Sequence, residues 1–491
     1  MIRFSNTALI VLPNVVIVLL CLFMLARMIS DFSITNDSTF YLTAAKNLVE
    51  KGELLVYSNW PSHSMQPEME KYTEYPPGFP LYLSLFILIF RNQFLAAMIA
   101  QSVAIVLLFL SLHLVALRLD LKPFTKIVFF VFLTFLIPFK LITVNLWSET
   151  IFVSLALLGL NFSLKIINGD DTKRNWIYGA LFLFLASWVR YIGILDVALF
   201  VVPILLSNRL RKKLLRTLLI VLFVSAPVFL WFLRSKILYG ITTESHGVGY
   251  SIDTARLMDP LIYLYKIFGW NKAIAWCFVL LFAVILVFPL FTKSNQTQIV
   301  KHKHLLVVAV IYFIGTYLIS LLASFDSLNH RILAPVIILG VIVLFSGVDL
   351  LYNILSNGKY GIIVFIIPLL IMMNMDLFNY NLELELSTKY PAEKLLWEKV
   401  EKIDQIKNSS HFYTDYNYKH QLFCKIPHRV IYFESLTDEI INKLQSIGKN
   451  PFYIFKLGSS FDEFLSNNYC NYGLRRVELV DVNYSLYLSI K

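Results

Sequence analysis

Long apolar runs separated by short polar segments make up most of the chain, which is the pattern of membrane-spanning helices. A helix needs about 20 predominantly apolar residues to cross the hydrocarbon core of a bilayer. The two runs that meet at Arg190 are short. The pattern predicts about eleven spans, over residues 8–29, 94–117, 124–143, 148–167, 176–192, 193–208, 214–233, 273–292, 304–323, 332–350 and 359–378.

The loop 31–93, between the first two spans, contains two further amphipathic or apolar segments. Gly78–Phe90 is too short to cross a bilayer, so we expect a helix lying in the membrane interface. The stretch Ser38–Val49 has the apolar spacing of an amphipathic helix, with Asp37 or Ser38 as the expected N-cap. We therefore expect juxtamembrane helices in this loop.

The positive charges decide the orientation. With Gly78–Phe90 left out of the spans, the basic clusters all fall on one side, which the positive-inside rule makes cytoplasmic. The N-terminus is then cytoplasmic, and loops 31–93 and 234–272 are extracytoplasmic. We expect a multi-pass protein of the plasma or inner membrane. The strongest cluster consists of Arg209, Arg211, Lys212, Lys213 and Arg216.

A composition typical of a soluble domain begins near Asp376. It predicts a transmembrane domain over 1–378 and a small extracytoplasmic α/β domain over 379–491. The sequence leaves open whether Cys424 and Cys470 form a disulfide in that domain. The expected elements of the domain are a helix over 392–406 and β-like runs over 429–433, 452–455 and 477–490.

Composition agrees with lipid as the main solvent. The chain of 491 residues is 57% hydrophobic and 15% charged, whereas soluble chains are about 45–50% apolar and about 25% charged. The net charge of +11 sits in clusters between apolar runs, so we expect a lipid bilayer rather than nucleic acid as partner. Walker A, HExxH, paired CxxC and GxSxG motifs do not occur, and we expect no cofactor and no metal site.

Four ionisable residues gather at the predicted outer face: Asp37, Glu149, Arg190 and Arg331. Ionisable groups at a membrane are functional candidates. Ordinary explanations also exist, because a carboxylate favours a helix start and an arginine can snorkel to lipid headgroups. In the functional interpretation the carboxylates perform acid–base chemistry, and the guanidinium groups hold a phosphate.

Several short motifs follow one another in an order that resembles the GT-C glycosyltransferase superfamily. That superfamily includes protein O-mannosyltransferases, lipid A aminoarabinose transferases and bacterial core-oligosaccharide transferases. Aminoarabinose transferases commonly have lysine directly before the Pro-Pro pair, where Tyr75 stands here. The motifs are Asn36-Asp37-Ser38-Thr39-Phe40-Tyr41, Tyr75-Pro76-Pro77-Gly78-Phe79-Pro80, Trp147-Ser148-Glu149-Thr150, Trp188-Val189-Arg190-Tyr191 and Asn329-His330-Arg331-Ile332.

The resemblance implies a catalytic cavity at the extracytoplasmic face and a sugar donor linked to polyprenyl phosphate. The acceptor would be a hydroxyl of a glycolipid, glycan or protein, and transfer would invert the anomeric carbon. By position, Asp37 is the expected base and Glu149 the second acidic residue. The expected substrate-binding residues are Arg190 and Arg331 for the donor phosphate, together with Tyr41, Tyr75 and His330.

Three other functions stay open at this point. A glycan polymerase or ligase also uses outer loops and arginines, although its largest loop usually comes late in the chain. A transporter or flippase of lipid-linked sugars needs charges near the midplane, whereas the unusual charges here gather at one face. In a noncatalytic scaffold the four ionisable residues would have no common role.

Overall fold

A computed structural model describes most of the helical part of the chain and the strands near its C-terminus. The expected spans 273–292 and 359–378 lie outside the described residues, as does His330. Two compact units divide the chain: Met1–Phe32, Thr73–Phe79 and Met98–Glu383 form the first, and Ser33–Tyr72, Pro80–Ala97 and Leu384–Lys491 the second. The described ranges are 6–57, 69–73, 75–206, 214–239, 296–322, 331–355, 412–414, 428–430, 452–456, 460–472, 474–479 and 484–489.

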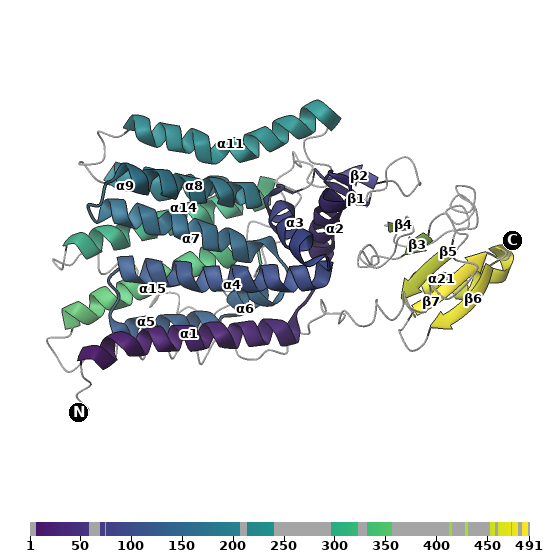
Figure 1. Ribbon diagram of the computed structural model, residues 1–491, viewed down its shortest axis with the longest axis horizontal. Coiled ribbons are helices and arrows are strands. Elements are labelled where there is room, and N and C mark those ends of the chain that lie inside the picture. Colours follow the sequence, from purple (N-terminus) through teal and green to yellow (C-terminus); the bar gives the residue numbers. More distant parts are fainter. Residues whose placement is uncertain are drawn as a thin grey trace. The chain divides into compact units, whose positions relative to one another are not determined.

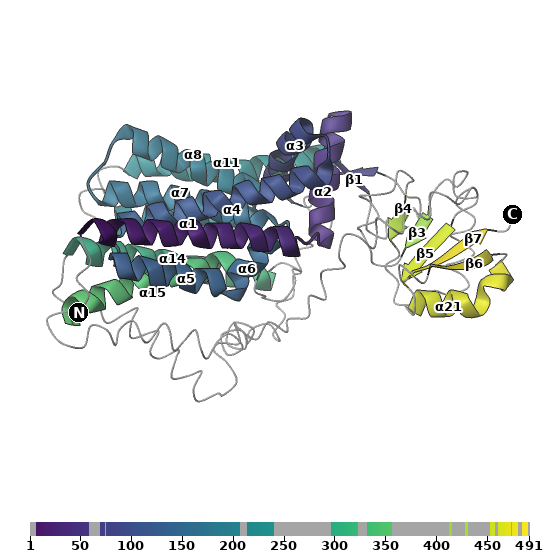
Figure 2. The same cartoon turned by 60° about the horizontal axis from the view of Figure 1, so that its bottom comes forward.

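The long helices run side by side (Figures 1 and 2). Within the described ranges six of them are long and apolar enough to cross a membrane, or seven with one bent pair counted as a span. The helices are α1 (Asn6–Asp31), α4 (Gln93–Arg118), α5 (Pro123–Phe135), α6 (Ile137–Val144), α7 (Ser148–Ile167), α8 (Lys173–Val189), α9 (Ala198–Leu206), α11 (Leu214–Tyr239), α14 (Gln296–Leu322) and α15 (Ala334–Leu355).

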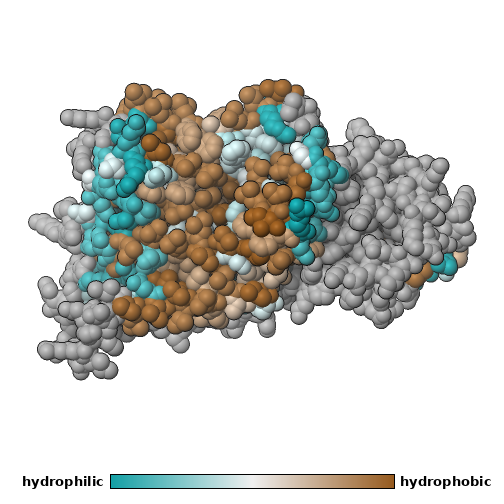
Figure 3. All heavy atoms as spheres, in the orientation of Figure 1, coloured by the Kyte–Doolittle hydropathy of each residue, from teal (hydrophilic) through white to brown (hydrophobic). Residues whose placement is uncertain are grey.

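Large apolar side chains cover the outer faces of these helices. Leu19 of α1 and Leu222 of α11 are 59% and 60% exposed, and hydrophobic residues form a broad surface along the helices (Figure 3). Water would penalise so large a contiguous apolar surface, whereas lipid tails do not. The chain is therefore a mostly helical, multi-pass membrane protein.

The expected span 124–143 is bent rather than straight. Helices α5 and α6 meet at an angle of 64°, on either side of Leu136, which has an extended backbone. Pro138 occupies the start of α6. Proline cannot donate an N–H to the preceding turn, and its ring clashes with the carbonyl four residues earlier, which explains the break.

A second interruption falls where the two short runs meet. Helix α8 ends at Val189, and Arg190 has an extended backbone, with φ −145° and ψ 141°. A 3-10 helix, η1 (Tyr191–Val197), then leads into α9. The region of the expected spans 176–192 and 193–208 thus contains α8, one extended residue, η1 and α9 in turn. Because Arg190 is not part of a helix, its side chain does not follow the direction of the α8 side chains.

The first loop contains α2 (Asn36–Lys51), α3 (Gly78–Phe90) and a short hairpin of β1 (Leu55–Tyr57) and β2 (Met69–Lys71). The expected N-cap of α2 is wrong. Thr35 caps this helix: its hydroxyl accepts from the Ser38 N–H, and its own N–H donates to the Ser38 hydroxyl. This reciprocal capping box satisfies two backbone donors.

The C-terminal residues form a mixed five-stranded sheet in the order β4-β3-β5-β7-β6. Strand β3 pairs in parallel with β4 and β5, while β7 runs antiparallel to β5 and β6. Cys470 is an exposed free thiol, and Cys424 and the expected helix 392–406 lie outside the described residues. The elements are β3 (Phe412–Thr414), β4 (His428–Val430), β5 (Phe452–Lys456), α21 (Ser460–Asn468), β6 (Leu474–Leu479) and β7 (Tyr484–Ser489).

Candidate functional site

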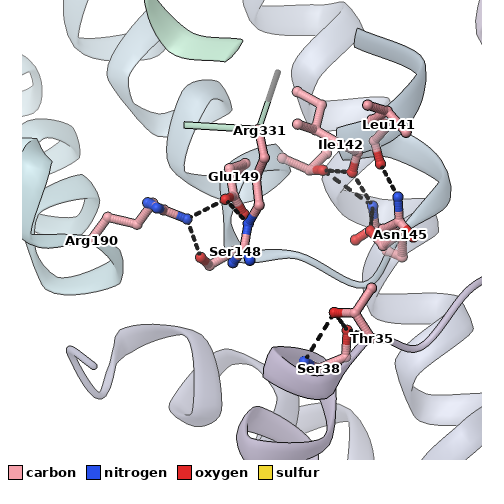
Figure 4. A network of polar contacts seen from close by, with 11 residues as sticks. Thr35, Ser38, Leu141, Ile142, Asn145, Ser148, Glu149, Arg190 and Arg331 are labelled. Atoms are coloured by element: carbon pink, nitrogen blue, oxygen red, sulfur yellow. Dashed lines mark hydrogen bonds and ion pairs between the residues drawn. The ribbon is translucent and has the colours of Figure 1, made fainter. Parts of the chain in front are cut away.

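Glu149 lies in the first turn of α7, where two arginines from distant parts of the chain meet it (Figure 4). Arg190 Nη1 and Arg331 Nε each lie 2.5 Å from the same carboxylate oxygen, Glu149 Oε1. The Glu149 side chain is 1% exposed, whereas those of Arg190 and Arg331 are 24% and 20% exposed. A ligand can therefore reach the guanidinium groups but not the carboxylate.

Each arginine has a second contact that fixes its direction. Arg190 Nη1 donates to the Ser148 hydroxyl at 3.0 Å, and the Arg331 guanidinium lies 4.7 Å from the centre of the Trp147 ring. Such charge-assisted and cation–π contacts hold a flexible side chain in one orientation. We call Trp147, Ser148, Glu149, Arg190 and Arg331 the Glu149 cluster.

The charge balance of the Glu149 cluster is positive. Among the described residues, two guanidinium groups pair with the Glu149 carboxylate. The cluster sits at the N-terminus of α7, where backbone N–H groups add positive potential. Glu149 Oε2 is buried without a hydrogen-bond partner among the described residues. The arrangement is chemically suited to holding an anion against the two arginines.

The turn before Glu149 is held by a buried amide. Gln101 of α4 is 1% exposed, and its Nε2 lies 2.9 Å from the carbonyls of Ile142 and Thr143 and 3.0 Å from that of Asn145. These carbonyls belong to the last turn of α6 and the turn after it, which lack helical partners. The sequence contained one signal for this role, a glutamine inside an otherwise apolar run.

The return of the first loop packs against the end of α8. A Cβ atom at Gly78 would lie 2.5 Å from the backbone oxygen of Trp188, so a side chain has no room there. Directly after Arg190, the Tyr191 ring stacks on the Phe232 ring, with 4.8 Å between the ring centres. Both contacts flank Arg190 and fix the backbone that carries it.

Of the remaining predicted site residues, Asp37, Tyr41 and Tyr75 lie within the described ranges. Asp37 is half-buried in the first turn of α2, and Tyr41 of the same helix is 2% exposed. Both belong to the second compact unit, whereas half-buried Tyr75 belongs to the first. Within the described ranges no group of three or more His, Cys, Asp or Glu side chains is placed to hold a metal ion.

The fold of the chain is similar to those of solved membrane glycosyltransferases. The structure of ArnT from Cupriavidus metallidurans bound to undecaprenyl phosphate matches with a TM-score of 0.58 at 10% identity, covering 99% of this chain and 98% of that one. The Archaeoglobus fulgidus oligosaccharyltransferase tethered to an acceptor peptide matches with a TM-score of 0.54 at 9% identity, covering 90% and 69%.

A second structure of that oligosaccharyltransferase, in complex with Zn and sulfate, matches with a TM-score of 0.52 at 10% identity, covering 90% and 68%. No protein-family model and no curated protein matches the sequence. The resemblance expected from the motifs is confirmed at the level of fold: this chain has the fold of the GT-C glycosyltransferases.

Replacing Gln101 with leucine should destabilise the protein. The Ile142 carbonyl keeps the Thr150 hydroxyl as a donor, and the Asn145 carbonyl keeps the Trp147 N–H. The substitution takes the Gln101 donor from the Thr143 carbonyl, and a buried acceptor left unsatisfied costs about 1–3 kcal/mol. We expect a lower apparent melting temperature in detergent. The control is Ser102→Ala, because that hydroxyl donates only within α4, to the Met98 carbonyl. Equal melting temperatures for the two variants would contradict the role of Gln101.

Replacing Gly78 with alanine should displace the backbone beside Arg190. The added methyl group would lie within contact distance of Trp188 backbone atoms that cannot rotate away, and a forced shift in a packed region typically costs about 1–3 kcal/mol. Gly340→Ala is the matched control, since a Cβ there meets nothing within 4 Å. We expect thermal unfolding to shift down for Gly78→Ala only, and a shift in both would argue against the contact.

Proposed function

We propose that this chain is an enzyme that transfers a sugar from a polyprenyl phosphate carrier to a hydroxyl group at the extracytoplasmic face of the plasma or inner membrane. The observation that carries the proposal is the Glu149 cluster. It presents two partly exposed guanidinium groups, held by one buried carboxylate, at the end of a membrane-spanning helix. A lipid-linked phosphate places its charge at this kind of boundary between membrane and water.

In this proposal Arg190 and Arg331 bind the phosphate of the donor. Guanidinium groups match phosphate oxygens in a planar fork, and they stabilise the charge that grows on the leaving polyprenyl phosphate. Ser148 already receives a hydrogen bond from Arg190, so it helps to aim that side chain. Because the phosphate leaves as an anion, its stabilisation lowers the barrier of the transfer step.

Glu149 acts as an anchor for the arginines rather than as a base. Its Oε1 atom is already engaged by both guanidinium groups, so it is not open to an acceptor hydroxyl. The sequence predicts a part in acid–base chemistry for Glu149, as the second acidic residue. Its 1% exposure and its two ion pairs favour a positioning role instead. The catalytic base of the transfer reaction is therefore a different residue, which we place in the first loop.

We assign that role to Asp37, on its place in the motif order. The acceptor hydroxyl oxygen attacks the anomeric carbon while the bond from that carbon to the phosphate oxygen breaks. The bonding electrons leave with polyprenyl phosphate, the Asp37 carboxylate takes the hydroxyl proton, and the anomeric carbon is inverted. Tyr41, Tyr75 and His330 complete the proposed substrate contacts. This mechanism uses no cofactor.

The two fold relatives support a lipid-linked donor. ArnT was solved with undecaprenyl phosphate, and the oligosaccharyltransferase with a tethered acceptor peptide. We accordingly propose a polyprenyl-phosphate-linked hexose or pentose as donor, and a glycolipid, glycan or protein as acceptor. The matching fold over nearly the full length of ArnT favours this function over a transporter or a scaffold.

Arg190→Gln should weaken binding of undecaprenyl phosphate to the purified protein. Hydrogen bonds to charged groups contribute about 1.5–3 kcal/mol, which corresponds to a loss of affinity of about 10- to 150-fold. The measurement is the rise in apparent melting temperature as the lipid phosphate is titrated into the protein in detergent.

Arg174→Gln is the matched control, because Arg174 lies at the opposite end of α8. That variant should keep wild-type affinity. A dipalmitoyl phosphatidic acid titration shows whether the site distinguishes the polyprenyl carrier from any lipid phosphate. Unchanged affinity in Arg190→Gln would remove Arg190 from the donor site.

Cells that lack this protein should accumulate one polyprenyl-phosphate sugar, and wild-type protein should clear it. Asp37→Asn should leave the donor uncleared, because loss of a general base lowers turnover by about 10²–10⁴-fold. Mass spectrometry of the lipid extract measures the donor and identifies its sugar. Asp31→Asn serves as control, since Asp31 is exposed and pairs with Arg27 at the end of α1.

Clearance by Asp37→Asn would show that the base lies elsewhere while the transferase function stands. If no lipid-linked sugar changes in cells lacking the protein, the transferase proposal itself fails.

A further inference from the structure

A small cavity lies inside the helical part of the first unit. It encloses about 20 Å³ and is lined mainly by apolar residues of α7 and α15, with Asp196 of η1 and Tyr312 of α14 as its polar members. Asp196 and Tyr312 are 0% and 1% exposed. Both polar side chains are therefore cut off from bulk solvent.

These two side chains have unmet hydrogen-bonding capacity. Asp196 Oδ1, Asp196 Oδ2 and the Tyr312 hydroxyl have no partner among the described residues. A buried polar group without a partner destabilises the folded state, and folded proteins rarely leave several such groups together. Asp196 and Tyr312 both line the same cavity, so one ligand there could be shared by the two side chains.

Packing around η1 holds Asp196 at this position. Leu195 lies over Gly315 of α14, where a Cβ atom would be only 2.7 Å from Leu195 Cδ1. Gly315 is one helical turn from Tyr312, so the same close approach of η1 to α14 brings the carboxyl and the phenol to one cavity. Asp196 also follows Arg190 by only six residues, through η1.

We propose that this cavity binds a single water molecule, hydrogen-bonded to the Asp196 carboxyl and the Tyr312 hydroxyl. One water molecule needs a cavity with about 10–15 Å³ of space for its centre, and it needs two to four polar partners. The cavity has a volume of about 20 Å³, and its lining includes two polar side chains with unsatisfied oxygen atoms, so both conditions are met.

The carboxyl group in this site is the neutral acid. Among the described residues that line the cavity there is no lysine, arginine or histidine, and burial without a counter-charge disfavours the ionised form. The acid O–H then donates to the water. A bound Na⁺ would instead require an ionised carboxylate and several further oxygen ligands, which the apolar wall does not supply.

The site lies close beneath the Glu149 cluster along two helices. Its lining includes Phe152, three residues after Glu149, and Pro335, four residues after Arg331. A water hydrogen-bonded to both side chains would link η1, the segment after Arg190, to α14 within the apolar interior. This inference is independent of the proposed transferase function, because it concerns only the folded protein.

A double-mutant cycle on thermal stability tests whether one water joins the two side chains. Tyr312→Phe should shift the apparent melting temperature of the wild-type protein more than it shifts that of Asp196→Leu, whose larger apolar side chain displaces the water. Tyr178→Phe is the matched control, since Tyr178 is 45% exposed on α8. Equal shifts from Tyr312→Phe in both backgrounds would overturn the shared site.

Infrared difference spectra of the full-length protein test the state of the carboxyl. At neutral pH we expect a protonated-carboxyl carbonyl band that is absent in Asp196→Asn and shifted in Tyr312→Phe. Asp196→Asn should retain the wild-type melting temperature, because an amide replaces a neutral acid. A carboxylate band in its place, with a Na⁺-dependent melting temperature lost in Asp196→Asn, would show a cation site and overturn the proposal.

Discussion

The pairing of the buried Glu149 carboxylate with two arginines is the interaction on which the arrangement of these helix ends depends. It draws Arg190, which follows α8, and Arg331, which precedes α15, onto one oxygen atom at the start of α7. Three segments far apart in the sequence thereby share one electrostatic centre. A buried ion pair costs desolvation energy that its attraction offsets only with good geometry, so the supporting contacts of Ser148 and Trp147 matter as much as the charges.

The surrounding structure serves to hold that centre still. Gln101 ties the end of α6 to the turn that carries Glu149, and Gly78 permits the first loop to lie directly on the backbone beside Arg190. Neither residue carries charge or chemistry of its own. Together they show that a rigid backbone, built from polar atoms and close packing, is what lets flexible arginine side chains meet at one point.

The hydrophobic pattern predicted the helices better than it predicted their interruptions. Spans such as those of α4, α7 and α15 follow directly from run length, because lipid imposes a length and excludes charge. The bend between α5 and α6 depends on Pro138, whose effect on direction cannot be derived from hydropathy. The 3-10 helix after Arg190 likewise depends on local packing, and the N-cap of α2 fell at Thr35, before the residues expected for it.

Three of the ionisable residues singled out from the sequence lie together in the structure, but their contacts could not be predicted. Charged residues near apolar boundaries identified Glu149, Arg190 and Arg331, yet no sequence pattern showed that one carboxylate oxygen would receive both arginines. Tertiary pairing between residues 182 positions apart, as in Glu149 and Arg331, has no local signature. Asp196 was not predicted as a site residue, because it is a single carboxyl group within the apolar run 193–208, which was interpreted only as a membrane span.

Because one carboxylate holds two arginines, the order in which these three residues can be replaced during evolution is constrained. A lineage that lost Glu149 first would retain two like charges around the place of a missing counter-ion, which is an unfavourable intermediate. A lineage that lost one arginine first would keep a neutral pair. Among related sequences, replacement of the glutamate should therefore accompany or follow replacement of an arginine, and the order of those changes records the electrostatics of the site.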